Sequence, residues 1–298
     1  MDINFKSSSP RYNTIRKYLE YLFGQKVHKI TLNINCGCPN FDGTLSYKGC
    51  IFCNQKSYSP SIKNTGLHLD EQIHKEVNRI QKRHKNITKY IAYLQAGTNT
   101  YIECIKFKYI LDNILKNNSI VGISIGTRPD FISNDILDIL EYYASKILLI
   151  LEIGLQSIHL KSLKWMRRNH DYKCFLNTYK KIKQRKHIKV STHIILGLPT
   201  ETSQDMHNTA TELANLEIDL VKLHNLYVAK DTDLAQEFIQ GKIQLSTFEE
   251  HINNVVDFIE RLHPQCIIDR VSSDAPKELI IAPHWCLDRQ ANQRAIDK

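Results

Sequence analysis

The sequence predicts an α/β fold, a partial (β/α)6 barrel of the TIM type with a C-terminal extension. Three observations predict it. Short β-branched, apolar runs alternate with longer amphipathic stretches, an order typical of parallel sheets covered by helices. Six such units follow one another, and Gly, Pro and short polar residues follow the apolar runs. The chain has 298 residues, which suffices for one barrel of about 200–250 residues with terminal additions.

The apolar runs are expected to be strands because they are rich in Ile, Val, Leu and Tyr and are short. The expected strands are Ile30–Asn35, Tyr90–Gln95, Ile120–Gly126, Ile147–Gly154, Lys189–Gly197 and Leu220–Tyr227. In barrels of this type, chemistry gathers at the C-terminal ends of the strands. The segments that follow these runs are therefore the first place to look for a site.

The stretches between the runs repeat apolar residues at helical spacing, as Ile73, Val77 and Ile80 do. A Ser-Asn pair before Asp135 predicts a helix cap. The expected helices are Asp70–His84, Cys104–Lys116, Asn134–Ser145, Leu176–Gln184, Ser203–Leu216 and Phe248–Leu262.

We expect three regions along the chain: an N-terminal helical extension over 1–29, the partial barrel over 30–230, and a C-terminal extension over 231–298. In the last region, Asp269–Arg270 and Leu279–Asp288 are expected to add a strand and close the open side of the barrel.

Composition indicates a cytoplasmic protein. No apolar run approaches the roughly 20 residues that cross a bilayer, and the N-terminus is polar. In a reducing compartment the eight cysteines are not expected to form disulfides. We expect four scattered ones, Cys104, Cys174, Cys266 and Cys286, to serve packing alone. The formal net charge of +9 permits binding to a polyanion without proving it.

A cysteine cluster follows the first expected strand. Cys50 and Cys53 form a CxxC pair, and Cys38 supplies a third thiol from the same region. Three thiolates suit an iron–sulfur cluster, whereas a fourth from Cys36 would complete a structural zinc site. The position after the first strand favours iron and sulfur. So does Cys36 itself, which continues the apolar face of that strand.

A set of short strings, in a fixed order and spacing, shows what this cluster resembles. Around the cysteines they are Cys38–Gly43 (CPNFDG) and Gly49–Cys53 (GCIFC); along the rest of the chain they are Gly24–Lys29, Gln95–Ala96, Thr98–Thr100, Gly126–Asp130, Glu152–Gln156, Gly197–Glu201, Lys222–His224 and Leu279–Asp288. The chain resembles the radical S-adenosylmethionine (SAM) superfamily, in particular its YhcC/YtqA group. More distantly, it resembles the radical SAM domain of the elongator catalytic subunit.

The resemblance implies that Cys38, Cys50 and Cys53 hold three irons of a [4Fe–4S] cluster and that Cys36 does not. The fourth iron would bind SAM, and a reductase or flavodoxin-type donor would supply the electron. The chain departs from the group at Cys36, where an apolar residue is expected, and at Phe41, where Arg is expected. Asn169 stands in place of a Gly, and both residues tolerate left-handed backbone angles.

Each part of SAM needs a partner of suitable chemistry. The expected cofactor-binding residues are Phe52 for the adenine, Gln95, Ala96, Gly97 and Thr98 for the amino group, Glu152 and Gln156 for the ribose, Arg168 for the carboxylate, and also Arg128. The alternatives are an idle edge charge for Glu152 and a surface ion pair for Arg128. His193 and His224 lie inside expected strands and are not predicted to be bases.

The sequence gives less evidence about the substrate than about the cofactors. Lys and Arg recur between residues 153 and 189 while acidic residues are nearly absent, which favours a phosphate backbone as partner. The resemblance implies tRNA, with remodelling of the side chain on carbon 5 of the wobble uridine. Two alternatives remain: a radical SAM enzyme acting on a small metabolite, and a zinc-stabilised, non-catalytic RNA-binding protein.

Overall fold

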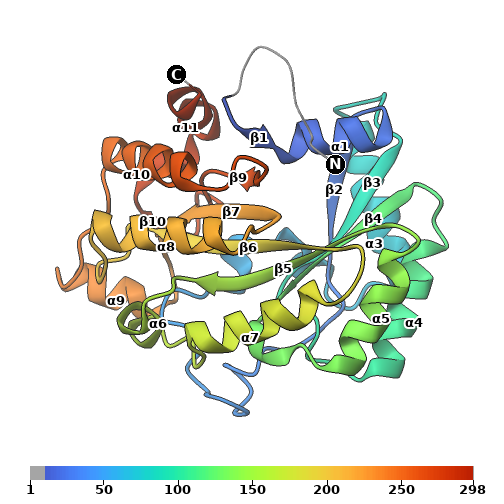
Figure 1. Ribbon diagram of the computed structural model, residues 1–298, viewed down its shortest axis with the longest axis horizontal. Helices are drawn as coiled ribbons and strands as arrows, with labels where there is room; N and C mark the ends of the chain where they lie inside the picture. Colours follow the sequence, from blue (N-terminus) through green and yellow to red (C-terminus); the bar gives the residue numbers. More distant parts are fainter. Residues whose placement is uncertain (1–10, 298) are drawn as a thin grey trace.

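Eight parallel strands form one curved sheet, the inner layer of a partial barrel (Figure 1). The structure is a computed structural model that describes residues 11–297, so the first ten residues of the expected N-terminal extension lie outside the described residues. The sheet has the order β1-β9-β7-β6-β5-β4-β3-β2. Its strands are β1 (Asn13–Thr14), β2 (Val27–Leu32), β3 (Lys89–Leu94), β4 (Ile120–Thr127), β5 (Leu148–Gln156), β6 (Ile188–Leu196), β7 (Leu220–Asn225) and β9 (Ile267–Arg270).

The six expected strands are confirmed as β2 to β7, with one shift. The first was expected over Ile30–Asn35 but runs over Val27–Leu32. Val27 pairs with Lys89 of β3, so the strand starts earlier than the apolar pattern indicates. It also ends earlier, at Leu32, and the expected last residue, Asn35, adopts a left-handed backbone with φ of 55°, outside the β region.

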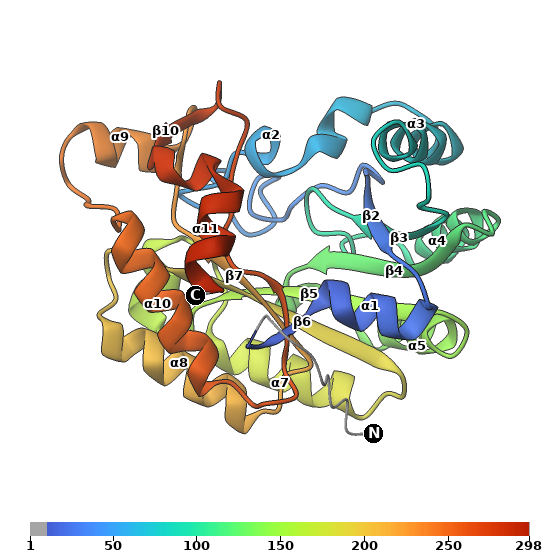
Figure 2. The same ribbon diagram turned by 90° about the horizontal axis from the view of Figure 1, so that it is seen from above.

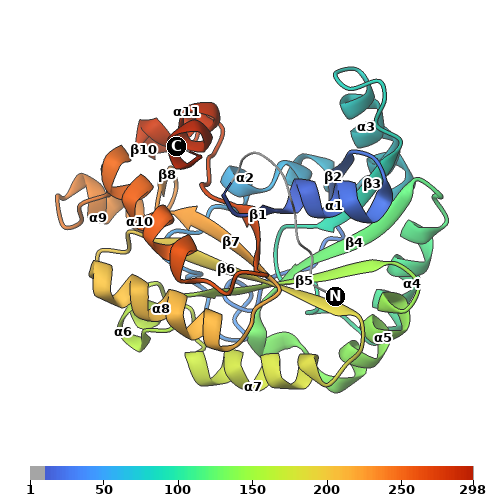
Figure 3. The ribbon, with the colours of Figure 1, turned by 45° about the horizontal axis from the view of Figure 1, so that its top comes forward.

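The C-terminal segment contributes to the same sheet. β9 lies parallel beside β7, which confirms the strand expected at Asp269–Arg270, and β1 pairs with β9 at the edge. A separate antiparallel pair joins β8 (Val228–Ala229) to β10 (Ile280–Ala282), within the expected Leu279–Asp288 segment. Figure 3 shows that the sheet curves without closing, since β2 and β1 remain its two edges.

The helices lie on the outer side of the sheet and at its ends (Figures 1 and 3). All six expected helices are confirmed within a few residues. The helices are α1 (Ile15–Phe23), α2 (Gln55–Tyr58), α3 (Leu69–Gln81), α4 (Cys104–Leu115), α5 (Asn134–Ala144), α6 (Leu160–Trp165), α7 (Tyr172–Lys183), α8 (Ser203–Asn215), α9 (Asp233–Ile239), α10 (Phe248–Arg261) and α11 (Arg289–Ile296). Ser133 caps α5 as predicted, accepting from the Ile136 amide at 3.2 Å. Within 11–297 no helix has the length and apolar character needed to cross a membrane.

Helix α1 covers the end of the sheet where the strands begin. It contacts both β2 and β9, so it spans the gap between the two sides of the open barrel. Tyr18 and Leu19 of α1 pack against inward-facing residues of the strands. These are Val27, Ile91, Ile150, Leu220 and Ile267. This apolar layer plugs the bottom of the barrel. Figure 2 shows α10 and α11 together on the opposite side of the molecule from α3 and α4.

Candidate active site

A cavity opens at the C-terminal ends of the strands, where the chemistry of β/α barrels is found. It contains all of the sequence-predicted cofactor and cluster residues. These are Cys38, Cys50, Phe52, Cys53, Gln95, Ala96, Gly97, Thr98, Arg128, Glu152, Gln156 and Arg168. Residues from β3, β4 and β5 or the loops after them, from the cysteine loop, and from the turn after α6 thus meet at one place.

The three thiols of the cluster converge on this cavity. Cys50 and Cys53 are joined by a tight turn in which the Cys53 amide donates to the Cys50 carbonyl at 3.0 Å. Burial, then the proximity of Cys50 and Cys38, raises the pKa of the Cys53 thiol. Three thiols at one cavity can all serve as thiolate ligands when a cationic group lies among them, and the irons of a cluster would supply that charge. The residues present therefore fit an iron–sulfur cluster.

Cys36 is separate from this group. It does not line the cavity, and its Sγ lies 3.9 Å from the carbonyl oxygen of Asn99. Burial raises its pKa to about 11, which keeps it a neutral thiol. Across residues 11–297, no three His, Cys, Asp or Glu side chains gather closely enough to hold a single ion. Cys36 therefore lies apart from the three thiols that line the cavity.

The other four cysteines do not belong to the site. In the described part of the chain, none of Cys104, Cys174, Cys266 and Cys286 lines the cavity. Cys266 and Cys286 are buried, and Cys104 packs against the main core.

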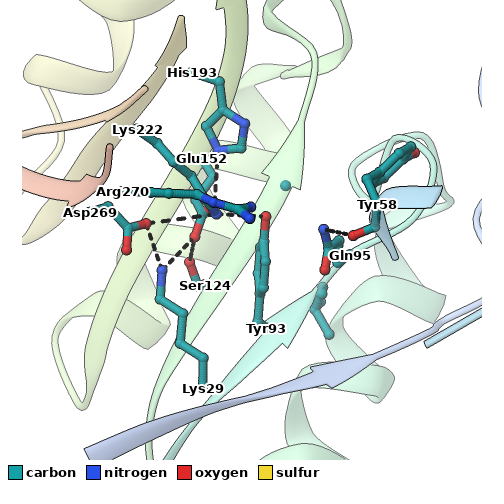
Figure 4. A network of polar contacts seen from close by, with 12 residues as sticks. Lys29, Tyr58, Tyr93, Gln95, Ser124, Glu152, His193, Lys222, Asp269 and Arg270 are labelled. Atoms are coloured by element: carbon teal, nitrogen blue, oxygen red, sulfur yellow. Dashed lines mark hydrogen bonds and ion pairs between the residues drawn. The ribbon is translucent and has the colours of Figure 1, made fainter. Parts of the chain in front are cut away.

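The segment after β3 forms the wall beside the cysteines. Gln95 donates from Nε2 to the Tyr58 carbonyl at 2.9 Å (Figure 4), and the Thr98 hydroxyl lies 3.6 Å from Cys38 Sγ. Ala96 and Gly97 both adopt left-handed backbone, with φ of 82° and 72°. These angles turn the chain back onto the cysteine loop, where the Thr98 amide donates to the Gly37 carbonyl at 2.9 Å.

Gly97 offers a sharp test of this packing. An added Cβ would lie 2.4 Å from the Cys36 carbonyl oxygen and 2.6 Å from that of Gly37, both backbone atoms. We expect Gly97→Ala to lower the free energy of unfolding by roughly 1–3 kcal/mol beyond the cost of its left-handed backbone. We also expect the variant to bind less iron after reconstitution, because the cysteine loop must shift. Urea unfolding and iron content measure both effects.

Gly24→Ala is the matched control. Gly24 has φ of 67°, yet nothing lies within 4 Å of its added Cβ. It should lose about 1 kcal/mol from the backbone alone and keep its iron. Equal losses in the two variants would contradict the role given to Gly97.

The two predicted arginines are buried beside the cysteines. Arg128 forms a two-pronged ion pair with Asp130, at 3.0 and 2.7 Å, and donates to the Arg168 carbonyl at 2.7 Å. It is only 3% exposed, so this is not the surface pair considered as its alternative. Arg168 donates from Nη2 to the Gly154 carbonyl at 2.7 Å, and its Nη1 lies 3.3 Å from Cys50 Sγ.

Glu152 is the centre of a buried ionic network (Figure 4). It accepts from Lys29 at 3.0 Å, from Lys222 at 2.7 Å, from His193 at 2.8 Å, and from the Ser124 hydroxyl. A carboxylate has about four lone-pair positions, and these four donors fill them. Glu152 is therefore not an idle edge charge. The expected contact of Glu152 with the ribose of SAM stays a prediction. In this geometry both carboxylate oxygens of Glu152 already accept hydrogen bonds, so neither is free for the ribose.

The network forms a layer across the barrel, two residues above the apolar plug. Because side chains alternate along strands, the residue two places after each plug residue also points inward. Those residues are Lys29, Tyr93, Glu152, Lys222 and Asp269. Lys29 also pairs with Asp269 at 2.7 Å, which ties β2 to β9 across the open side. Two lysines and two carboxylates balance, so we call this set the ionic layer.

Burial and neighbouring charges shift the pKa values of Glu152 in the ionic layer and of two histidines beside it. Burial alone would raise the pKa of Glu152, but Lys222 and Lys29 hold it well below its usual value. Burial lowers the pKa of His193. Burial and then His193 and Arg270 hold the pKa of His224 well below its usual range. The two histidines are therefore neutral at neutral pH and add no charge to the two lysines and two carboxylates of the ionic layer.

Sequence reasoning missed most of the ionic layer. The signal was present: Lys29 and Lys222 interrupt apolar strands at inward-facing positions, where a lysine is kept only with a partner. Asn40 was missed as well, and its Nδ2 lies 3.2 Å from Cys50 Sγ. It follows a loop cysteine, and no periodic pattern marks it.

Comparison with known proteins agrees with this geometry. The family model described as "Radical SAM superfamily" matches residues 7–213, and the "Radical_SAM C-terminal domain" matches 218–298. The chain is 35% identical to the uncharacterized protein YtqA of Bacillus subtilis over 99% of its length and 91% of that protein. It is 32% identical to YhcC of Escherichia coli over 93% of its length and 88% of that protein.

Two more distant matches involve proteins that are longer than this chain. The tRNA uridine(34) acetyltransferase of Methanocaldococcus infernus is 26% identical over 54% of this chain and 30% of that protein. The solved structure of Elp3 from the same organism superposes with a TM-score of 0.65 at 18% identity, over 86% of this chain and 58% of that one, which shows a shared fold. The chain belongs to the radical SAM superfamily, in the group of YtqA and YhcC, and its cofactors are a [4Fe–4S] cluster and SAM.

Proposed function

We propose that this chain binds its cluster through Cys38, Cys50 and Cys53 and remodels the side chain on carbon 5 of the wobble uridine in tRNA. When bound, the cluster supplies the electron that splits SAM into methionine and a 5′-deoxyadenosyl radical. The observation that carries the proposal is the cavity itself, in which the three thiols face the polar ends of the strands.

The residues of the chain bind, orient and exclude water. Phe52 gives an apolar wall for the adenine, and residues 95–98 offer backbone acceptors to the amino group of SAM. Gln156 remains a candidate for the ribose, since the acceptors of Glu152 are filled. Below the cavity, the ionic layer and the apolar plug separate the reacting atoms from solvent. Such shielding matters because a radical abstracts hydrogen from any C–H bond it meets.

Several features support RNA as the substrate. The net charge is +9, and Lys173, Lys180 and Lys181 are exposed on α7. Helix α7 lies on the outer side of the sheet (Figure 3), so these lysines suit the capture of a phosphate backbone rather than contact with the reacting base. One relative is named for uridine 34 of tRNA. A base in the anticodon loop is already unpaired, so entering the cavity costs little.

Two measurements test the proposal. Anaerobically reconstituted protein should hold about four irons per chain and form 5′-deoxyadenosine from SAM after reduction. Mass spectrometry of wobble uridines should show an altered carbon-5 side chain in cells that lack the gene, restored by the wild-type chain but not by Cys50→Ser.

Each alternative has its own outcome. SAM cleavage with unchanged tRNA nucleosides would indicate a small-metabolite substrate. One zinc per chain without SAM cleavage would indicate a non-catalytic RNA-binding protein. We further propose a cytoplasmic location, which cell fractionation would test. We also propose a reductase or flavodoxin-type electron donor, which pull-down under reducing conditions and electron-transfer assays would test.

A further inference from the structure

Cys50 differs from the other two thiols of the site because two N–H donors reach its sulfur. Asn40 Nδ2 lies 3.2 Å from Cys50 Sγ, and Arg168 Nη1 lies 3.3 Å from it. Both residues are buried: Asn40 is 0% exposed and Arg168 is 7% exposed. Burial keeps water from competing for these contacts, so the sulfur receives one neutral and one charge-assisted hydrogen bond.

A strained turn holds Arg168 in this position. Arg167 and Asn169, on either side of it, adopt left-handed backbone with φ of 57° and 54°. A left-handed residue other than Gly costs about 1 kcal/mol, and such strain persists where the surroundings enforce it. Asn169 tolerates the angle better than Arg167 does. Because both neighbours of Arg168 adopt this unfavourable backbone conformation, we infer that the turn serves to orient the Arg168 side chain.

The turn is fastened to the cysteine loop through Asn40. Its Nδ2 donates to the Arg167 carbonyl at 3.0 Å as well as to Cys50, and its Oδ1 accepts from Asn169 Nδ2 at 3.0 Å. Arg128 holds the carbonyl of Arg168 from the other side at 2.7 Å. The thiol, the arginine and the turn therefore form one rigid unit.

From the sequence, Arg168 is expected to bind the carboxylate of SAM through two parallel N–H donors. In this geometry both terminal nitrogens of Arg168 already have other partners. Nη1 faces Cys50 and Nη2 donates to the Gly154 carbonyl. The remaining donor, Nε, is buried and has no partner among the described residues. A carboxylate would have to displace one of the two existing contacts before Arg168 offered it two parallel donors.

We propose that Arg168, positioned by Asn40 and Arg128, sets the reduction potential of the cluster through the Cys50 sulfur. This inference rests on the proposed assignment of Cys50 as a ligand. Reduction adds one electron, which comes from the electron donor, and forms or breaks no bond. N–H donors and a positive charge at a ligand sulfur stabilise the added negative charge, so they raise the potential.

The test is an anaerobic redox titration of reconstituted protein, followed by electron paramagnetic resonance. Arg168→Gln removes the charge, and we expect it to make reduction about tenfold less favourable, a shift of about 59 mV to lower potential for one electron. Asn40→Leu should shift the potential in the same direction. Lys164→Gln is the control, because it removes an exposed positive charge on α6, four residues before Arg168, and should leave the potential unchanged.

The competing role predicts a different pattern. If Arg168 binds the SAM carboxylate instead, Arg168→Gln will weaken SAM binding, measured by equilibrium dialysis, and leave the potential as in the wild type. That result would overturn the inference. If Arg168→Gln fails to hold a cluster, Asn40→Leu, which removes the other N–H donor to the Cys50 sulfur and keeps the charge of Arg168, must still titrate below the wild type. A Cys50→Ser variant that keeps all its iron would instead overturn the ligand assignment.

Discussion

Serine at any one of positions 38, 50 or 53 is expected to abolish SAM cleavage. Partners that only touch a ligand already change metal affinity or activity by 10–100-fold, so loss of a ligand should cost at least about a hundredfold in 5′-deoxyadenosine formation. The expected physical cause is an incomplete cluster. Iron and sulfide per chain should fall together with the charge-transfer absorbance of the cluster, and the fold should remain, as far-ultraviolet circular dichroism would show.

Cys36→Ser is the matched control for this prediction. Cys36 lies two residues before Cys38, is a free thiol like the others, and contacts the Asn99 carbonyl rather than the cavity. We expect it to retain full iron and near wild-type cleavage. If Cys36→Ser lost its metal to the same extent as Cys38→Ser, the site would be a four-thiolate centre with no open position for SAM, and the zinc-stabilised alternative would hold.

The order of strands and helices was predictable because the spacing of apolar residues along the chain reflects which side chains are buried. Strands β3 to β7 are buried on both faces and appear in the sequence as continuous β-branched runs. β1 was not predictable, because its two residues are too few to show an alternating pattern of apolar and polar side chains. The start of β2 was missed for a related reason: Val27, His28 and Lys29 are only half-buried and two of them are polar, so the apolar pattern starts late.

The grouping of the expected cofactor residues around one cavity was predictable for a different reason, namely that strand ends in a β/α barrel meet at one rim. No local sequence pattern predicts which polar side chains form hydrogen bonds and ion pairs with one another inside the barrel. Glu152, Lys29 and Lys222 lie on three strands that are far apart in the sequence. Their pairing depends on the curvature of the sheet, so the place of Glu152 at the centre of the ionic layer could not be predicted, while its contact with SAM stays a prediction.

Glu152→Gln is expected to be the most destabilising conservative substitution in the barrel. It keeps the shape of the side chain but leaves Lys29 and Lys222 with only Asp269 as a buried counter-charge. Breaking a buried ion pair from one side costs roughly 3–5 kcal/mol. Urea unfolding at neutral pH measures this loss. The double variant Glu152→Gln, Lys222→Met is the control, and it should recover part of the loss because it restores the charge balance.

The loss should depend on pH in a defined direction. The pKa of Glu152 in the folded chain lies well below the usual 4.5. A depressed carboxyl pKa stabilises the fold at pH values above the unfolded pKa, and this stabilisation is lost as the pH falls through the folded pKa. The gap in stability between the wild type and Glu152→Gln should therefore be constant from pH 7 down to about 5 and shrink below it. A gap that stayed constant into strong acid would show that the substitution disturbs packing, and that the ionic layer does not depend on the charge of Glu152.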